Sequence, residues 1–236
     1  MSFVEDLEKK VKDYLDGDYE IINAREIPSV ENVAFGKKAI KMDLCVLCID
    51  LRKSTELMFI HEKETSGKIH KAFLTIVSQV VLRNKGRIRS FQGDSLLAFW
   101  TANKKSDIDN AVKTAMTIKW LLDIKLSSLF EQYQKIDFGI GIDWGEVYIL
   151  RAGISRDANN NDLVFIGKCV NFAVAIANQA ESPKHVEISS STYENLTDDW
   201  KYGEKNGKSV NIWKDCSFPW KGSEYKTKTT SWYNHF

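Results

Sequence analysis

The feature that most constrains the fold is an uninterrupted apolar run that ends in an acid. Residues 44–49 are all apolar, and Asp50 follows them directly, ahead of a polar turn at 51–55. A short apolar run of this kind predicts a strand buried on both faces. Asp50 then lies where the strand leaves the core, and a carboxylate beside buried surface needs a partner. Two partners are open at this point: a divalent metal ion, or the N-terminus of a helix that begins near Ser54.

A second acid favours the metal ion. Residues 87–100 predict two strands joined at Gly93–Asp94, because glycine followed by aspartate suits a tight turn. Divalent cations such as Mg²⁺ take oxygen ligands, and Mg²⁺ usually holds one or two protein carboxylates together with substrate phosphates. Asp50 and Asp94 together therefore predict a magnesium site of two carboxylates.

Four stretches occur in an order that resembles the class III nucleotidyl cyclases, the catalytic domains of adenylate and guanylate cyclases. They are Ile49–Arg52, Phe91–Asp94, Gly139–Val147 and Ile166–Ala173. The separation of the two aspartates is also similar to that of the family's metal ligands. With Trp220-Lys221-Gly222 near the end, the resemblance extends from about Lys41 to the C-terminus. Each motif alone is weak, and the ordered set is strong.

The resemblance implies an α+β fold of the ferredoxin-like class III cyclase type, a mixed and mainly antiparallel sheet covered by helices. The order of the predicted strands and helices agrees with it. The cofactors implied are two divalent cations, Mg²⁺ or Mn²⁺, at Asp50, Leu51 and Asp94. The turn after them consists of Leu51, Arg52, Lys53, Ser54 and Thr55. Its backbone amides are predicted to bind the β- and γ-phosphates, because exposed amides at a helix start bind anions.

A second subunit completes the site in this family, so the resemblance implies a homodimer with composite active sites. Asn171 matches the asparagine that orients the ribose, and Lys221 matches the lysine that reaches the triphosphate. Both are candidate catalytic residues. The alternatives are that Asn171 is a polar residue of a helix start without a role, and that Lys221 is a surface charge.

Three positions depart from the family pattern. Ala175 stands where the family has its transition-state arginine, so charge on the transferred phosphoryl group must be met by another group, such as Arg151, Lys168 or a relocated arginine. The two base-reading positions are Ser90 and Val164. Serine and valine reproduce neither the lysine and aspartate of adenylate cyclases nor the glutamate and cysteine of guanylate cyclases, and sites built on hydrogen bonds discriminate strongly against a base they cannot pair.

A base other than a purine is therefore predicted, and the chain resembles the bacterial pyrimidine cyclases of anti-phage defence. The implied reaction converts UTP, or CTP, to its 3′,5′-cyclic monophosphate and pyrophosphate, and a separate effector protein reads the product. Two alternatives remain: an adenylate cyclase with an atypical base pocket, and a nucleotide-binding module that has lost activity, which Ala175 favours.

Length, net charge and apolar segments limit the number of domains, the binding partners and the cellular compartment that the sequence predicts. The 236 residues suffice for one α/β domain, predicted at 41–236 after an N-terminal helix and connector at 1–40. A formal net charge of +1 gives no electrostatic argument for binding nucleic acid or a membrane. No apolar segment is long enough to span a bilayer, so the sequence predicts a cytoplasmic protein. Cys45 and Cys48 point to opposite faces of the predicted strand and cannot share a metal.

The remaining pattern predicts the scaffold. Helices are expected at 3–16, at 54–81 with a break near Gly67, from about Ser106 to Leu129, and at 170–180. Two strands, 136–143 and 146–151, are expected to turn at Trp144-Gly145. Glycines alternate through the first of these strands, which usually marks close approach by another backbone or a ligand.

Overall fold

The computed structural model describes residues 2–133, 135–155 and 157–235. Its α-helices are α1 Phe3–Leu15, α2 Ser54–Ile60, α3 Lys63–Arg83, α4 Lys105–Trp120, α5 Ser127–Glu131, α6 Lys168–Gln179, α7 Ser190–Glu194 and α8 Asp198–Lys201. Short 3₁₀ turns occur at η1 Val30–Asn32 and η3 Ala158–Asn160, and a π-helical turn, η2 Leu121–Lys125, continues α4.

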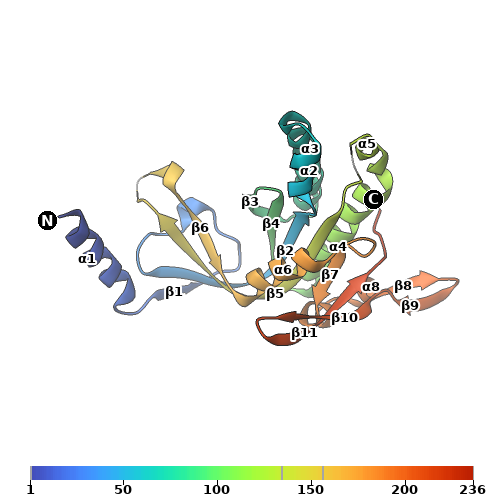
Figure 1. Cartoon of the computed structure of the whole chain (residues 1–236). Coiled ribbons are helices and arrows are strands. Elements are labelled where there is room, and N and C mark those ends of the chain that lie inside the picture. The colour runs from blue at the N-terminus through green and yellow to red at the C-terminus, as the bar shows by residue number, and fades with distance from the viewer. Residues whose placement is uncertain (1, 134, 156, 236) are drawn as a thin grey trace.

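One large sheet forms the centre of the molecule (Figure 1). Its strands run in the order β10-β11-β7-β5-β2-β4-β3, with β1 added beside β2 and β6 beside β5. The bounds are β1 Glu20–Asn23, β2 Lys38–Leu51, β3 Arg87–Gln92, β4 Ser95–Thr101, β5 Phe138–Gly153, β6 Asn161–Ile166, β7 Val186–Ser189, β10 Lys214–Trp220 and β11 Ser223–Thr230. Strands β8 Tyr202–Lys205 and β9 Lys208–Asn211 form a separate hairpin. Among the described residues only β1–β2 and β5–β7 are parallel pairs, so the predicted mixed, mainly antiparallel sheet is confirmed.

The longest pairing joins β2 to β5, and it corrects the predicted turn at Trp144-Gly145. Strand β5 passes through these residues without turning, because Cys45 and Leu44 of β2 pair opposite them. The register continues from Ile40 opposite Ile149 to Leu51 opposite Phe138. A glycine in a strand does not by itself make a turn when a neighbouring strand pairs with the residues on both sides of it.

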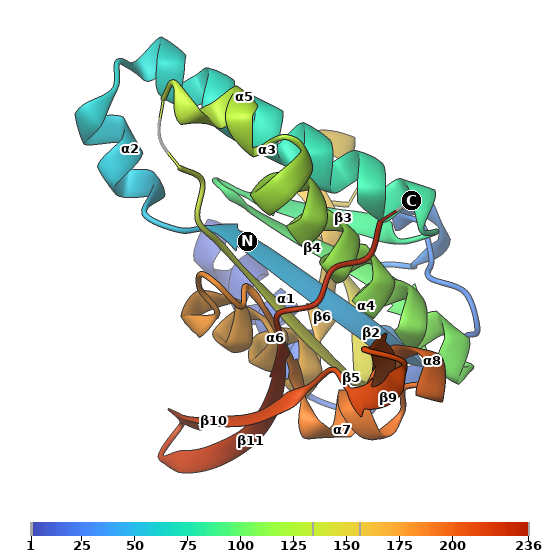
Figure 2. The ribbon, with the colours of Figure 1, turned by 90° about the vertical axis from the view of Figure 1, so that its right-hand side faces the viewer.

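Each face of the sheet carries its own apolar core. Helices α3 and α4 cover one face, and α6 covers the other (Figure 2). Cys45 belongs to the first core and Cys48 to the second, which confirms that the two thiols point to opposite faces. Burial raises the pKa of Cys48 to about 12, so this thiol carries no charge with which to bind a metal at neutral pH.

Helix α6 lies directly on the glycines of β5. A Cβ on Gly139 would meet the carbonyl oxygen of Ala177 at 2.0 Å, and one on Gly141 would meet that of Ala173 at 2.1 Å. The predicted close approach is therefore that of a helix backbone. This packing fixes α6 over the end of β2 that carries Asp50.

Two predicted helices are divided differently in the structure. The break in the first lies at His61 and Glu62, both extended, rather than near Gly67, which sits inside α3. In place of the second, helix α4 ends at Trp120, and the chain continues as the π-helical turn η2 and then as the separate helix α5. Leu129 lies in α5 and is exposed rather than buried. The spacing of apolar residues predicts which face of a helix is buried. It does not show where the backbone of exposed residues interrupts the helix.

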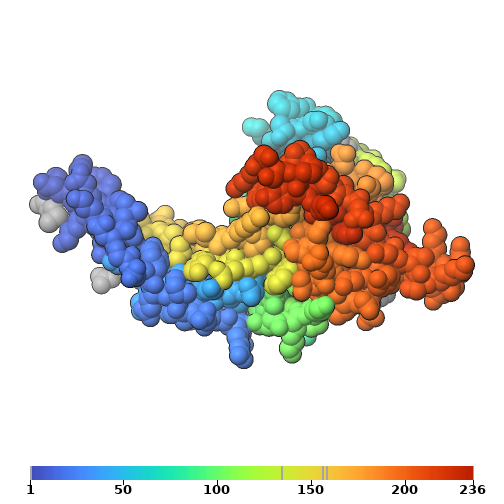
Figure 3. All heavy atoms as spheres, turned by 90° about the horizontal axis from the view of Figure 1, so that it is seen from below, coloured from blue at the N-terminus to red at the C-terminus, as the bar shows by residue number. Residues whose placement is uncertain are grey.

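The N-terminal segment projects from the body of the molecule (Figures 1 and 3). Helix α1 has no buried residue, and Lys37 bonds its C-terminal end through Asp13 and the carbonyl of Asp16. Strand β1 belongs to the predicted connector yet pairs with the start of β2. The division at residue 40 stays a prediction. No helix in the described part of the chain is long and apolar enough to cross a membrane.

The contact between α6 and β5 gives a stability prediction. Gly141→Ala is expected to cost about 1–3 kcal/mol or more, because its methyl group would overlap backbone atoms of α6 that cannot rotate away. Gly67→Ala is the matched control, since its Cβ has no neighbour within 4 Å. It should stabilise helix α3 by about 0.5–1 kcal/mol. Urea unfolding measures both, and equal effects would contradict the packing described.

Candidate active site

Asp50 and Asp94 lie side by side at one end of the sheet. Asp50 is the penultimate residue of β2 and pairs with Ser95 of β4 and Gly139 of β5. Asp94 immediately precedes Ser95, in a tight turn where Gly93 takes a left-handed φ of +65°. The predicted hairpin with its turn at Gly93–Asp94 is thus present, and it places the second carboxylate next to the first.

Electrostatics at this pair favour a cation. Burial, and then the charge of Asp94, raise the pKa of Asp50 to about 6, while Arg52 acts in the opposite direction. Two neighbouring acids at a half-buried position ionise together only when positive charge compensates them. Within the described ranges no group of three or more His, Cys, Asp and Glu side chains is placed to hold a metal. Two carboxylates suffice for a Mg²⁺ ion that completes its shell with phosphates and water, so these residues fit such an ion.

Asp50 does not cap the following helix. The N-cap of α2 is Lys53, in the left-handed region at φ +57°, and no side-chain cap hydrogen bond to this helix is present among the residues that the structure describes. The alternative interpretation of Asp50 as a helix cap is therefore wrong. The side chain of Leu51 is buried, so only the backbone of this residue can face a ligand.

Part of the predicted phosphate-binding turn already forms hydrogen bonds to other residues of the chain. The Arg52 amide donates to the carbonyl of Asp137 at 2.9 Å, which corrects its assignment as a free phosphate donor. The Arg52 guanidinium donates to the carbonyl of Asn178 on α6. The amides of Lys53, Ser54 and Thr55 have no such acceptor among the described residues, as expected at a helix start.

Asn171 and Lys221 come from elements that are packed together. Asn171 is exposed on α6, and Phe172 beside it contacts Trp220 with ring centroids 4.9 Å apart. Lys221 follows Trp220 at the tip of the β10–β11 hairpin, with its Nζ 4.9 Å from the Trp220 ring centre. This aromatic contact holds the hairpin against α6.

Within one chain, Asn171 is not brought to Asp50. Arg52, two residues after Asp50, bonds α6 at Asn178, and Asn171 lies seven residues earlier on that helix. Seven residues correspond to roughly 10 Å along a helix axis. Asp50 and the turn after it therefore lie near the C-terminal end of α6, whereas Asn171 lies near the N-terminal end of this helix.

Ala175 faces the aromatic cluster that α6 shares with the β10–β11 hairpin. Arg151, one proposed replacement for the missing arginine, is engaged elsewhere. Its guanidinium donates to Asn161 at 3.1 Å and to the carbonyl of Val33 at 3.4 Å. Lys168 lies near the buried Asp143, whose pKa is raised by burial and lowered by the charge of Lys168, and its Nζ is 5.1 Å from the centre of the Tyr225 ring.

The two base-reading positions lie on different strands: Ser90 on β3, which pairs with β4, and Val164 on β6, which pairs with β5. Ser90 pairs with Leu97, one residue beyond a bulge in β3. Val164 on β6 is 43% exposed, whereas Phe165 beside it turns inward and stacks on Phe99. Successive residues of a strand point to opposite faces, so the Val164 side chain points to the face opposite the one on which Phe165 contacts Phe99.

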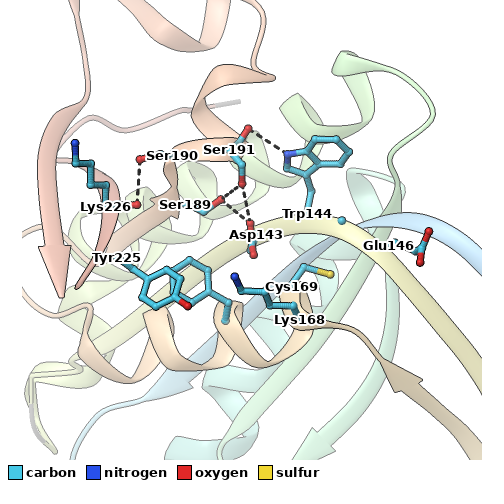
Figure 4. Close-up of a pocket in the computed structure, with 12 residues that line it drawn as sticks. Asp143, Trp144, Glu146, Lys168, Cys169, Ser189, Ser190, Ser191, Tyr225 and Lys226 are labelled. Carbon is cyan, nitrogen blue, oxygen red and sulfur yellow. Dashed lines mark hydrogen bonds between the residues drawn. The ribbon is translucent and has the colours of Figure 1, made fainter. Parts of the chain in front are cut away.

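A cavity that the sequence did not indicate lies beside the start of α6 (Figure 4). It has a volume of about 540 Å³ and is lined by parts of β5, α6, β7, α7 and β11. Asp143 is buried in its wall, where Ser189 donates to the carboxylate at 2.6 Å, and burial raises the pKa of Asp143. Lys168 also lines it, but Asp50, Asp94, Asn171 and Lys221 do not. Side chains from five elements form this cavity, and no spacing in the sequence could reveal it.

Known proteins resemble this chain in sequence and in fold. A uridylate cyclase from Burkholderia cepacia is 30% identical over 240 residues, which cover 98% of each protein. The chain belongs to the class III nucleotidyl cyclases. Two solved cyclases share the fold at 21% identity: the adenylyl cyclase CyaB from P. aeruginosa, with a TM-score of 0.68 over 81% of this chain and 95% of that one, and the guanylyl cyclase Cya2, with 0.67 over 82% and 94%. No protein-family model matches. The predicted family, fold and class of enzyme, a nucleotidyl cyclase, are confirmed.

The raised pKa of Asp50 gives a pH-dependent prediction for the metal-free protein. Because this pKa is about 6 when folded and near 3.8 in its ordinary state, the folded chain keeps a proton that the unfolded chain has lost. Stability should therefore fall as the pH rises from about 4 to about 6. Asparagine does not titrate, so in a chelator Asp50→Asn should raise the melting temperature near neutral pH and change it little near pH 4.

Asp43→Asn is the control, because Asp43 is an exposed acid on the same strand. Thermal unfolding of both variants at the two pH values makes the comparison. A loss of stability in Asp50→Asn that is equal at both pH values would contradict the burial and charge repulsion assigned to Asp50.

Proposed function

We propose that this chain is a metal-dependent cyclase that converts UTP, or alternatively CTP, to the 3′,5′-cyclic monophosphate with release of pyrophosphate. The observation that carries the proposal is the pairing of Asp50 and Asp94 at adjoining strand ends, in a chain of the nucleotidyl cyclase family. Mg²⁺ or Mn²⁺ is the proposed cation, held by both carboxylates and the backbone of Leu51.

In the reaction the 3′-hydroxyl oxygen forms a bond to the α-phosphorus, and the bond from that phosphorus to the pyrophosphate oxygen breaks. The bound cations supply a lower pKa for the hydroxyl and charge neutralisation for the phosphates. The amides of Lys53, Ser54 and Thr55 bind the β- and γ-phosphates. Asn171 orients the ribose and Lys221 binds the triphosphate, both from the second copy of the chain.

The preference for a pyrimidine rests on Ser90 and Val164. Neither offers the charged or donor–acceptor pair with which purines are read, and a small hydroxyl beside an apolar group leaves a pocket of modest polarity. The name of the B. cepacia relative supports uridine. The proposed setting is a cytoplasmic homodimer in anti-phage defence, whose cyclic product a separate effector protein binds.

Ala175 favours a second candidate, a cyclase-like module that binds nucleotide without turning it over. One clamp on the transferred phosphoryl group is missing, and loss of such a group can cost orders of magnitude in rate. The retained carboxylate pair favours the enzyme. A cyclase that uses ATP through a rearranged base pocket is the remaining alternative.

Purified protein incubated separately with UTP, CTP, ATP and GTP in the presence of Mn²⁺ tests the reaction. Mass spectrometry should detect a cyclic product, most from UTP. A preference for ATP would establish the purine alternative. Tight nucleotide binding by a folded dimer without product from any of the four would establish the binding module.

Removing either metal ligand should abolish turnover. Asp50→Ala and Asp94→Ala are each expected to lower kcat more than about a thousandfold with the fold intact, because each loses a carboxylate that holds the cation. Asp43→Ala serves as the control on the same strand. Near-normal rates in either of the first two variants would place the metal elsewhere.

Complementation tests the shared site. Asp50→Ala and Asn171→Ala chains should each be inactive alone, but a heterodimer contains one site with both residues intact. Random mixing makes half of the dimers heterodimers, so roughly a quarter of wild-type activity should return. Mixtures that stay inactive, with subunit exchange shown by native mass spectrometry, would place the whole site in one chain.

A further inference from the structure

A buried polar network lies behind the strand end that carries Asp50. At its centre is Asp123, in the π-helical turn η2 that follows α4. One carboxylate oxygen lies 3.1 Å from Nε2 of His185, and the other accepts from the hydroxyl of Tyr233 at 3.3 Å. The three residues come from regions far apart in the sequence, and the cyclase chemistry described above uses none of them.

His185 connects this carboxylate to the beginning of β5. Its side chain is buried, and its Nδ1 lies 2.7 Å from the carbonyl oxygen of Phe138. Its ring stacks on that of Phe138 with centroids 4.1 Å apart. Its own carbonyl accepts from the amide of Ile140 at 2.7 Å. His185 therefore holds the first residues of β5 through both its side chain and its backbone.

The first residues of β5 are direct neighbours of the metal-binding strand. Phe138 pairs with Leu51, and Gly139 pairs with Asp50. The carbonyl of Asp137, one residue earlier, accepts the Arg52 amide. A shift of this segment would therefore move both Asp50 and the turn that follows it.

The C-terminal segment closes the network from the other side. It runs along α4 (Figure 2), where the Asn234 amide donates to the carbonyl of Met116 and its side chain donates to Thr117. The Tyr233 ring lies 4.3 Å from Nζ of Lys119. Lys119 is fully buried, and within the described chain its ammonium has no hydrogen-bond acceptor. The Tyr233 ring thus provides its cation–π contact, so the position of the tail depends on Lys119 as well as Asp123.

We propose that Asp123, His185 and Tyr233 are positioning residues for the metal site. They hold the first residues of β5, which pair with Asp50 and Leu51, and the C-terminal segment is thereby part of the support of the active site. This inference rests on the proposed function of the Asp50 and Asp94 pair. Buried networks whose members are all bonded fix one geometry more tightly than apolar packing does, and groups that orient metal ligands act at a distance from the metal.

Asp123→Asn and Tyr233→Phe test the proposal in the full-length protein. Asparagine has one accepting oxygen and a donating amide group, so it can no longer accept from both His185 and Tyr233, and it removes the negative charge beside the imidazole. Phenylalanine keeps the ring against Lys119 and removes only the hydroxyl. For Asp123→Asn the Mn²⁺ concentration at half-maximal UTP turnover should rise roughly 10- to 100-fold, the range found when partners of metal ligands are removed. Tyr233→Phe should raise it less, with an unchanged KM for UTP at saturating Mn²⁺.

Two controls separate positioning from stability. Asp109→Asn alters a buried acid of α4, whose carboxylate accepts from the amide and hydroxyl of Thr197. Tyr193→Phe removes a hydroxyl that accepts from Asn211. Both should lower the melting temperature without changing the Mn²⁺ requirement. If Asp123→Asn and Asp109→Asn lose stability equally and keep the wild-type Mn²⁺ requirement, the network is structural and the proposal is wrong.

Direct Mn²⁺ binding, followed by electron paramagnetic resonance with UTP present, gives a readout that does not need turnover. A wild-type protein that makes no cyclic product contradicts the proposed function, while weaker Mn²⁺ binding by Asp123→Asn than by Asp109→Asn would still support the network. Should Asp123→Asn not fold, Tyr233→Phe decides: wild-type Mn²⁺ binding in that variant overturns the proposal.

Discussion

The antiparallel ladder between β2 and β5 is the constraint on which the rest of the structure depends. It fixes Asp50 opposite Gly139, and because this glycine and Gly141 have no side chains, α6 can lie on β5 with backbone in contact. One ladder therefore places a carboxylate, the turn after it and the helix that carries Asn171. The contact between Phe172 and Trp220 then positions the β10–β11 hairpin, which carries Lys221, against α6.

Charge is the second constraint. Burial, and then the charge of Asp94, raise the pKa of Asp50, so ionising both acids at this strand end is costly. Under the proposed function a divalent ion with bound phosphates would relieve the repulsion, which would link substrate binding to the ionisation of the two acids. Asn171 lies at the far end of α6 from this pair, and this separation supports the proposal of a site shared between two copies of the chain.

Much of this arrangement could be predicted from residue order. The apolar run before Asp50, the Gly93–Asp94 turn and the glycines of β5 each have a local cause, and the structure contains the strand, the turn and the close helix contact. The predicted turn at Trp144-Gly145 is wrong, because continuous pairing with β2 on both sides of Gly145 keeps the chain extended. The hydrogen bond of the Arg52 amide to Asp137, and the network around Asp123, join residues too far apart in sequence for any spacing to reveal. The roles of Asn171, Lys221, Ser90 and Val164 stay predictions.

The central claim is that Asp50 and Asp94 hold the cation at a site completed by a second copy of the chain. A crystal structure of the protein with Mn²⁺ and a non-cyclisable UTP analogue, with anomalous scattering recorded for manganese, tests it most directly. The account predicts manganese in contact with both carboxylates and with the phosphates, and Asn171 of the other subunit at the ribose. Manganese at other side chains, or a ribose bound by Asn171 of the same chain, would contradict it.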